Sequence, residues 1–588
     1  MEDEDWTTQE VGNWVSRGLL TREHVMSRLD HRIKASSAID PDQEPTIEAL
    51  LLPAPTGASS GEGQILTKQA FISLLQAKAS FPKGPAGTEA GRIIYESIFY
   101  LSSLPYPLSS PEPSSQPGSL SLAQLNRALV WVLPNRAKYI IEESNFSRIR
   151  TRWDRLRLLF QSLATGTVPH SAQAAVRDHA RLLTARHAFD VSWDGFLDIC
   201  AVNHDDDGDE IYHDLLDVLY STQEERPSWS TLVRRDAFRD IAKKIKTEEK
   251  LPELCTLAIP VQRFKNLVKV LLMLHITPTN TSVDGNTDLS QYDDAADSIC
   301  AAFAQDRDIG ITDLITWPSF ANAIEIAAPH IVEPLYRLLT VTFMNKPAPP
   351  DILEPPNPPR NLPEDAILTL PRVSQLVSFL AETMEAGYLR RTNRYASSNF
   401  PTPAALVEAM ISVPEEAIVL FSGRVTTATG VAAEQGRLCV FGLYSPVPRK
   451  DGSRIQAPSE IKPNDAGQRQ CQLFQLAPVQ DVFRGVAGKP GWSVVTDAQG
   501  GENLVFGDAG PIDGTEQQRK GGVALVLRDG LQRGKIQQWG GVVDLRSDDG
   551  EGDDGKKNGI VYEANPSRGD WVVEFVVEEI EIWSEDPV

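Results

Sequence analysis

The sequence predicts an α+β chain of several domains, with a helical N-terminal region and a β-rich C-terminal region. Apolar residues recur every three or four positions as far as Met344, which is the spacing of helices that bury one face. Beyond Asp365, short runs of β-branched and aromatic residues are separated by Gly, Pro and Asp, as in an antiparallel β-sandwich. A chain of 588 residues is also too long for a single hydrophobic core.

Proline marks the boundary between the two regions. Eight of the twenty residues from 346 to 365 are proline, which fixes φ and lacks the amide hydrogen that helices and sheets use. We therefore expect four segments: N-terminal helices and a loop over 1–64, a helical domain over 65–345, a proline-rich linker over 346–365 and a sandwich domain over 366–588. An extended linker would let the two halves reorient around a partner.

Periodicity predicts the individual elements. In the N-terminal half it predicts a first helix pair within 1–34 and helices at 71–75, 93–101, 122–132, 153–163, 174–188, 215–220, 264–274, 295–304 and 334–343. In the C-terminal half it predicts one helix at 373–385 and strands at 417–421, 438–444, 471–476, 492–495, 504–506, 523–527, 536–539 and 571–583. The acidic segment 547–557 is expected to be a disordered hairpin tip.

The last expected strand has two interpretations. Alternate apolar residues from Trp571 to Val577 share one parity, whereas Ile580 and Ile582 have the other. A bulge near Glu578 and Glu579 would turn both sets toward one core. A strand that is buried on both faces would need no bulge.

The charge of the chain argues against nucleic-acid binding. Lys and Arg number 57 against 80 Asp and Glu, so the net charge is −23 and the surface repels a phosphate backbone. One basic run is a local exception, and it contains Arg148, Arg150, Arg152, Arg155 and Arg157. These positions spread round several faces of a helix, so we expect a solvated surface there rather than a nucleic-acid site.

The cysteines favour a reducing compartment, because they are widely spaced and form no CxxC pair that would indicate disulfides or zinc. They are Cys200, Cys255, Cys300, Cys439 and Cys471. The acidic start of the chain does not resemble a signal peptide, and Glu2 excludes N-myristoylation of the chain as written. No apolar run reaches the ~20 residues that cross a bilayer. We therefore expect a cytoplasmic protein that meets membranes through a partner.

Histidine placement limits the chemistry of the C-terminal half. None of the nine histidines lies beyond His330, so this half lacks a Ser-His-Asp triad, a Cys-His dyad and a His-containing metal site. Three carboxylates gather on the last strand at Glu578, Glu579 and Glu581. Adjacent strand residues point to opposite faces, so we expect a solvated edge there rather than a catalytic pair.

One acidic loop in the helical half approximates a calcium-binding EF-hand loop. Asn203, Asp205, Asp207 and Asp214 match ligand positions 1, 3, 5 and 12, but the bidentate Glu is missing and Glu210 occupies an apolar position. Two other segments have the same outline with fewer ligands, at 66–71 and 308–319. We therefore expect degenerate EF-hand-like pairs without a bound metal or cofactor.

A series of motifs in the C-terminal half resembles the TLDc domain. The motifs are AIVLFSG at 417–423, VFGLY at 440–444, LFQL at 473–476, DVFR at 481–484, VFG at 505–507, GVALVL at 522–527 with Asp529, and FVVEEIEIW at 575–583. The resemblance implies two antiparallel sheets flanked by short helices, without an established catalytic site. It also implies links to oxidation resistance and to the vacuolar-type proton-pumping ATPase, whose assembly TLDc proteins regulate.

Together with the helical half, these motifs resemble the fungal family called restriction of telomere capping protein 5. The helical half contributes IYESIFYL at 94–101 and EPLYRLL at 333–339, so the resemblance covers nearly the whole chain. Two features depart from the family. Residues 397–400 alone represent its glycine-rich turn, and the acidic insertion at 547–557 is specific to this chain. The words "telomere capping" in the family name are a genetic label. The acidic composition of this chain does not support contact with DNA.

These observations lead to one main hypothesis and two alternatives. The main hypothesis is a monomeric, non-enzymatic adaptor that binds peripheral subunits of the vacuolar-type ATPase and meets the vacuolar membrane through them. The first alternative is an enzyme that uses carboxylates or a thiol at Cys439 or Cys471, although these cysteines lie in apolar runs where buried, inert thiols are usual. The second is a calcium-gated adaptor that uses the 203–214 loop.

Overall fold

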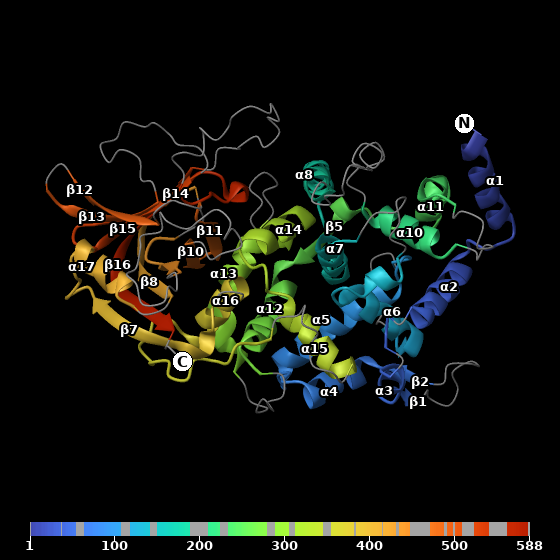
Figure 1. Ribbon diagram of the computed structural model, residues 1–588, viewed down its shortest axis with the longest axis horizontal. Coiled ribbons are helices and arrows are strands. Elements are labelled where there is room, and N and C mark those ends of the chain that lie inside the picture. The colour runs from blue at the N-terminus through green and yellow to red at the C-terminus, as the bar shows by residue number, and fades with distance from the viewer. Residues whose placement is uncertain are drawn as a thin grey trace, which may run out of the picture.

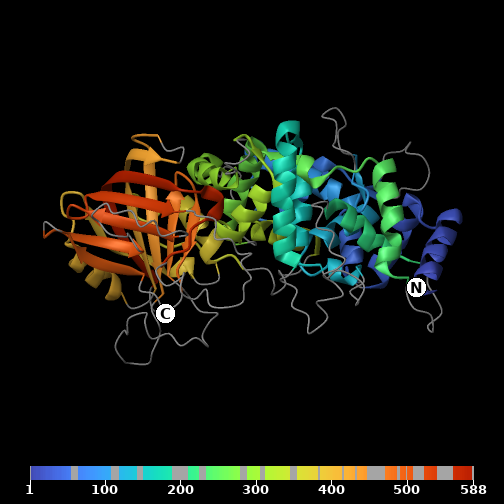
Figure 2. The same cartoon turned by 90° about the horizontal axis from the view of Figure 1, so that it is seen from above.

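The computed structural model of the chain is α+β, as the sequence predicts, with helices in the N-terminal part and an antiparallel sheet in the C-terminal part (Figure 1). It describes residues 2–36, 38–40, 42–53, 64–107, 118–141, 150–188, 210–223, 233–278, 288–304, 312–344, 354–381, 384–413, 416–430, 434–446, 471–486, 491–497, 500–507, 522–539 and 561–585. The two parts lie side by side along the long axis (Figures 1 and 2). Within these residues, no helix is both long enough and apolar enough to span a bilayer.

Every helix predicted for the N-terminal part is present. The helices are α1 (Glu2–Ser16), α2 (Arg22–Ala35), α3 (Glu44–Glu48), α4 (Lys68–Lys78), α5 (Pro85–Ser102), α6 (Leu122–Val132), α7 (Arg152–Leu163), α8 (His170–Ala188), α10 (Glu210–Ser221), α11 (Arg239–Glu248), α12 (Val261–His275), α13 (Asp293–Phe303), α14 (Trp317–Ile326) and α15 (Glu333–Leu339). One core contains Trp14 of α1, Leu29 of α2 and Phe160 of α7. The described apolar faces of α1 and α2 are therefore buried in the same core as the helices that follow.

Short strands connect the starts of several helices. β2 (Gln64–Leu66) pairs antiparallel with β1 (Leu52–Pro53) and β3 (Leu120–Ser121), and β5 (Leu257–Pro260) pairs with β4 (Gly166–Thr167) and β6 (Leu314–Ile315). A helix follows directly after β2, β3, β5 and β6. The hydroxyl groups of Thr67, Ser121 and Thr316 cap α4, α6 and α14 by accepting hydrogen bonds from backbone amides.

The C-terminal part contains a ten-stranded antiparallel sheet. Its strands are β7 (Leu389–Ala396), β8 (Ala417–Thr429), β9 (Leu438–Ser445), β10 (Gln472–Ala477), β11 (Asp481–Arg484), β12 (Trp492–Thr496), β13 (Glu502–Gly507), β14 (Gly522–Arg528), β15 (Arg533–Trp539) and β16 (Trp571–Glu585). The order is β11-β10-β9-β8-β16-β15-β14-β13-β12, and β7 also pairs with β16. All predicted strands are present, whereas β7, β11 and α17 (Pro403–Ile411) were not predicted. β7 escaped prediction because it is rich in arginine and mostly solvated.

Strand β16 combines the two interpretations of its sequence. Its register against β8 shifts between Val577 and Glu579, which places a bulge at the expected position. Beyond the bulge, Glu581, Ile582 and Trp583 are all fully buried. Ile582 packs into the core of the sheet, and Trp583 packs on the other face with α16 (Leu370–Leu380). The C-terminal half of the strand is therefore buried on both faces.

The helical part and the sheet are packed against each other. Ile276, at the end of α12, shares a core with Leu376 of α16 and Phe474 of β10. The backbone amide of Gln480 donates a hydrogen bond of 2.9 Å to the carbonyl oxygen of Ser298 in α13. The expectation that the linker lets the halves reorient is therefore wrong for this structure. Periodicity could not reveal the contact, because it joins residues that are far apart in the sequence.

Candidate functional site

A buried cluster of ion pairs lies between α7 and α10. Arg157 reaches both oxygens of Asp214, with Nη1 2.6 Å from Oδ2 and Nη2 2.7 Å from Oδ1. Arg150 Nη1 donates to the same carboxylate at 2.7 Å. The three side chains are between 2% and 4% exposed. The bidentate geometry matters here, because it helps to offset the cost of removing these charges from water.

Three more residues complete the cluster. Asp154 Oδ1 lies 3.3 Å from Arg157 Nη2, and Asp217 Oδ1 lies 2.7 Å from Arg235 Nε. Asp217 Oδ2 is also 3.7 Å from Arg150. Three guanidinium groups thus face three carboxylates, so the cluster as a whole is neutral.

The expectation of a solvated basic surface is wrong for part of the arginine run. Arg150 and Arg157 are buried in the cluster, while Arg152 is exposed and Arg155 is partly buried. Arg148 lies outside the described residues. No local pattern predicts this burial, because Asp214 lies 57 positions beyond Arg157 and meets it through the packing of two helices.

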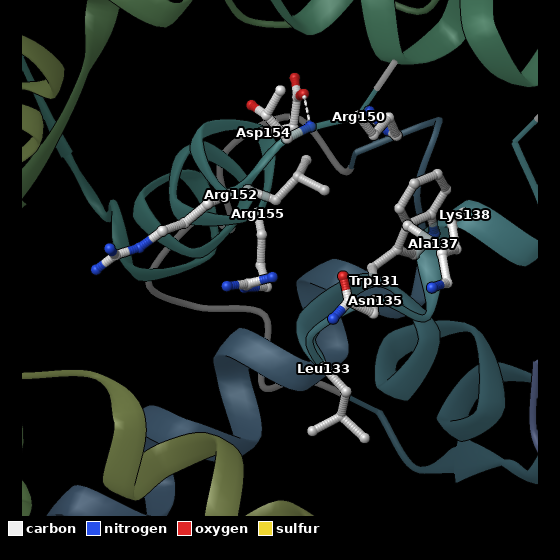
Figure 3. Close-up of a pocket in the computed structure, with 11 residues that line it drawn as sticks. Trp131, Leu133, Asn135, Ala137, Lys138, Arg150, Arg152, Asp154 and Arg155 are labelled. Carbon is white, nitrogen blue, oxygen red and sulfur yellow. Dashed lines mark hydrogen bonds between the residues drawn. The ribbon is translucent and has the colours of Figure 1, made fainter. Parts of the chain in front are cut away.

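Beside the cluster, a pocket of about 100 Å³ lies between the end of α6 and the start of α7 (Figure 3). Its α7 side is fixed by a capping box, in which Asp154 Oδ2 accepts a hydrogen bond of 2.8 Å from the amide of Thr151. Its α6 side is shaped by Asn135, whose φ of 57° is in the left-handed region that asparagine tolerates. Both walls are therefore set by local backbone structure.

Basic side chains line this pocket. Figure 3 shows the ends of Arg155 and Asn135 on facing sides, with Lys138 beyond Asn135 and Arg152 directed away from both. Arg155 Cζ lies 5.2 Å from the ring centroid of Tyr336, and burial raises the pKa of that phenol. Arg152 donates a hydrogen bond to a backbone carbonyl oxygen instead. Cations therefore predominate among the described residues that line the pocket.

The predicted calcium loop is described at one of its four ligand positions. Asn203, Asp205 and Asp207 lie outside the described residues. Asp214 lies in α10, where its carboxylate is bound by Arg150 and Arg157. Among the residues that the structure places, no group of three or more His, Cys, Asp or Glu side chains could hold a metal ion.

The three glutamates of β16 have different surroundings. Glu578 is exposed, and Glu579 pairs with Arg394. Glu581 is fully buried, contrary to the expected solvated edge, and its Oε2 accepts hydrogen bonds from the amide of Ile367 at 3.0 Å and from Trp583 Nε1 at 2.9 Å. Its Oε1 lies 2.8 Å from Arg391 Nη1, so this carboxylate joins the residues that follow the proline-rich segment to β7 and β16.

Sequence reasoning missed a second buried pair, in the sheet. Arg568 Nη1 lies 2.7 Å from Asp481 Oδ2, and Asn565 Nδ2 donates to the other oxygen of Asp481 at 3.0 Å. Arg568 Cζ also lies 4.3 Å from the ring centroid of Trp571. These contacts fix residues 561–570 against β11. The available signal was an aspartate at the start of an apolar strand, in the DVFR motif.

The two cysteines of the thiol alternative lie in the sheet. Cys439 is fully buried, and burial raises the pKa of its thiol to about 12. Cys471 is partly buried, and burial raises its pKa to about 11. A nucleophilic cysteine needs a lowered pKa, so both thiols are in environments that suppress reactivity.

No family model matches this sequence, and no curated protein matches it either. The likeness to TLDc proteins therefore depends on the motifs themselves.

Proposed function

We propose that the chain is a non-enzymatic adaptor of the TLDc type, similar to the fungal restriction of telomere capping protein 5 family. Its partners would be peripheral subunits of a vacuolar-type proton-pumping ATPase, whose assembly it would regulate, with a role in oxidation resistance. The observation that carries the proposal is the position of the TLDc-like motifs, which fall on β8, β9, β10, β11, β13, β14 and β16 of one sheet. Motifs that share one folded unit support a domain resemblance better than scattered motifs do.

We also propose that the sheet folds back on itself as the sandwich that the resemblance implies. The ring centroids of Phe421 in β8 and Phe506 in β13 are 5.5 Å apart. Three other strands separate β8 from β13 in the sheet order, so a flat sheet would hold them about 19 Å apart. The aromatic contact supports a strongly curved sheet that encloses its own core.

A related proposal concerns the helical part, where β2, β3, β5 and β6 precede helices and pair in twos. Paired EF-hands join their loops through such short antiparallel strands. The arrangement supports EF-hand-like pairs, and the loop sequences at 203–214 and 308–319 lack ligands that an EF-hand requires, so we propose that the pairs are degenerate and structural.

The docked halves give the proposed adaptor a single rigid surface. Contacts of α16 with α12, and of Gln480 with α13, fix the sheet against the helices. With a net charge of −23, this surface suits a partner with basic patches, since opposite potentials speed and orient association. Both halves can then contact one large assembly without any change in their relative position.

Affinity purification tests the adaptor proposal. The purified full chain is immobilised and incubated with an extract that contains the vacuolar-type ATPase, and captured proteins are identified by mass spectrometry. An unrelated protein of similar net charge is the matched bait, because it reveals capture by charge alone. We expect ATPase subunits on the full chain and not on the control. Recovery of no pump subunit would remove the proposal.

The calcium-gated alternative has a simple test. If the 203–214 loop binds calcium, millimolar calcium raises the melting temperature of the chain above that in a chelator, because a ligand that binds the folded state stabilises it. We expect the same melting temperature in both conditions.

A further inference from the structure

Among the described residues that line the pocket between α6 and α7, cations outnumber carboxylates. The buried cluster beside it is neutral, as described above, and Lys138 and Arg155 are additional to it. Neither cation forms an ion pair with a carboxylate in the parts of the chain that the structure places. In a protein of net charge −23, this pocket is a local site of positive potential that attracts small anions.

Two buried donors at this pocket also lack acceptors. Arg155 Nε and Trp131 Nε1 are inaccessible to solvent, and neither has a hydrogen-bond acceptor among the described residues. Trp131 is 2% exposed, so bulk water does not reach it freely. Buried polar atoms are nearly always satisfied in folded proteins. These donors show that polar groups beside the pocket are not all satisfied within the described residues, and the excess of lining cations indicates that a bound ligand would be an anion.

We propose that this pocket binds the phosphate group of a small soluble molecule. Arg155 and Lys138 would neutralise the charge. A phosphate monoester carries close to two negative charges at neutral pH and presents three strong acceptor oxygens, which matches the two cations that line the pocket. A carboxylate offers one charge and two oxygens. The volume of about 100 Å³ suits one oxyanion group rather than an entire nucleotide.

A soluble phosphate fits this chain better than a lipid headgroup. An anionic bilayer repels a surface of net charge −23, whereas a small anion can enter a local positive pocket without bringing the whole surface close to other charges. This inference goes beyond the adaptor proposal and does not depend on it, because ATPase binding needs no phosphate pocket.

Isothermal titration of the full chain with inorganic phosphate tests the inference at neutral pH and constant ionic strength. We expect saturable binding at one site. Lys138→Met and Arg155→Met should each weaken the affinity about tenfold, as the loss of a charge-assisted hydrogen bond does. Methionine preserves much of the apolar stem, so Arg155→Met retains packing against Tyr336. Circular dichroism confirms that each variant is folded, and Lys138 is exposed, so its variant keeps the test valid if Arg155→Met unfolds.

Lys243→Met is the matched control. Lys243 is exposed, and its Nζ lies 5.9 Å from the ring centroid of Tyr212, much as Lys138 Nζ lies 5.5 Å from that of Tyr139. Its replacement removes the same charge and the same kind of ring contact away from the pocket. We expect its phosphate affinity to stay within about twofold of the parent, since a distant exposed charge is screened.

Several results would overturn the inference. They are the absence of saturable binding at millimolar phosphate, or an equal loss of affinity in Lys243→Met and Lys138→Met. A separate experiment distinguishes a lipid headgroup from a soluble phosphate. It measures sedimentation of the chain with phosphatidylcholine vesicles that contain or lack phosphatidylinositol phosphate. Binding to the phosphorylated vesicles that free phosphate fails to displace would contradict a soluble ligand.

Discussion

The side-chain amide of Gln480, in the sheet part, donates a hydrogen bond of 2.8 Å to the carbonyl oxygen of Ala327 in the helical part. The same nitrogen donates to Ser378 Oγ at 2.9 Å, and Gln480 Oε1 accepts from Gln375 Nε2 at 3.1 Å. Gln480 is 1% exposed, so no water can replace these partners easily. One side chain thus links the sheet, α16 and the helical core.

Gln480→Ala is expected to weaken the docking of the two halves. It removes three buried hydrogen bonds and leaves their partners unsatisfied, which should lower the free energy of unfolding by about 2–4 kcal/mol. We expect urea unfolding, followed by tryptophan fluorescence and circular dichroism, to separate into two transitions. Gln291→Ala is the control, because Gln291 is exposed and bonds a nearby backbone carbonyl. An equal effect of both changes would contradict the role of Gln480.

The Arg157–Asp214 pair leads to a prediction about buried charge. Asp214→Leu leaves the Arg150 and Arg157 guanidinium groups buried without their shared carboxylate, so we expect a loss of about 3–5 kcal/mol in the free energy of unfolding. Denaturant unfolding of the purified variant measures it.

A surface pair of equal length provides the control for that prediction. Arg177 and Glu253 also approach to 2.6 Å, but their side chains are 41% and 46% exposed. Glu253→Leu should therefore cost about 0–1 kcal/mol, as exposed ion pairs usually do. If both substitutions destabilise the chain equally, the burial of the cluster is not what makes Asp214 important.

Helices and strands that local periodicity determines could be predicted from the sequence. The burial of charged side chains could not, because it depends on partners that are far away in the sequence. The 122–132 helix is present with its predicted bounds, because its capping box and apolar spacing are local signals. Burial of Arg157 was not predictable, since its partner Asp214 comes from another helix. Glu581 was misplaced for the same reason, because Ile367 and Arg391, which donate to its two carboxylate oxygens, are far from it in the sequence.

Acid should weaken the packing of the helical part through His330. Burial, with the nearby Arg152 charge, lowers the pKa of this imidazole to about 4, whereas an unfolded histidine titrates near about 6.5. Between these values the unfolded chain binds a proton that the folded chain does not, so stability falls as the pH falls. One group with this shift accounts for up to about 3 kcal/mol.

His330→Gln removes this proton linkage, so the free energy of unfolding should depend less steeply on pH between about 6.5 and 5 than in the parent. Urea unfolding at a series of pH values measures the slope. His31→Gln, at an exposed position of α2, is the control and should keep the parental slope. Identical slopes in all three proteins would show that His330 does not couple stability to pH.

Thiol labelling decides between the adaptor and a thiol-dependent enzyme. Since burial raises the pKa of Cys439 to about 12 and that of Cys471 to about 11, little thiolate exists at neutral pH. We expect alkylation of both in the folded chain to be about 100-fold slower, or slower still, than in urea, where the thiols titrate near about 8.5. Peptide mass spectrometry follows each site, and the unfolded sample controls for reagent activity. Rapid modification of either residue in the folded protein would favour the enzyme alternative, because a thiolate nucleophile would then be available.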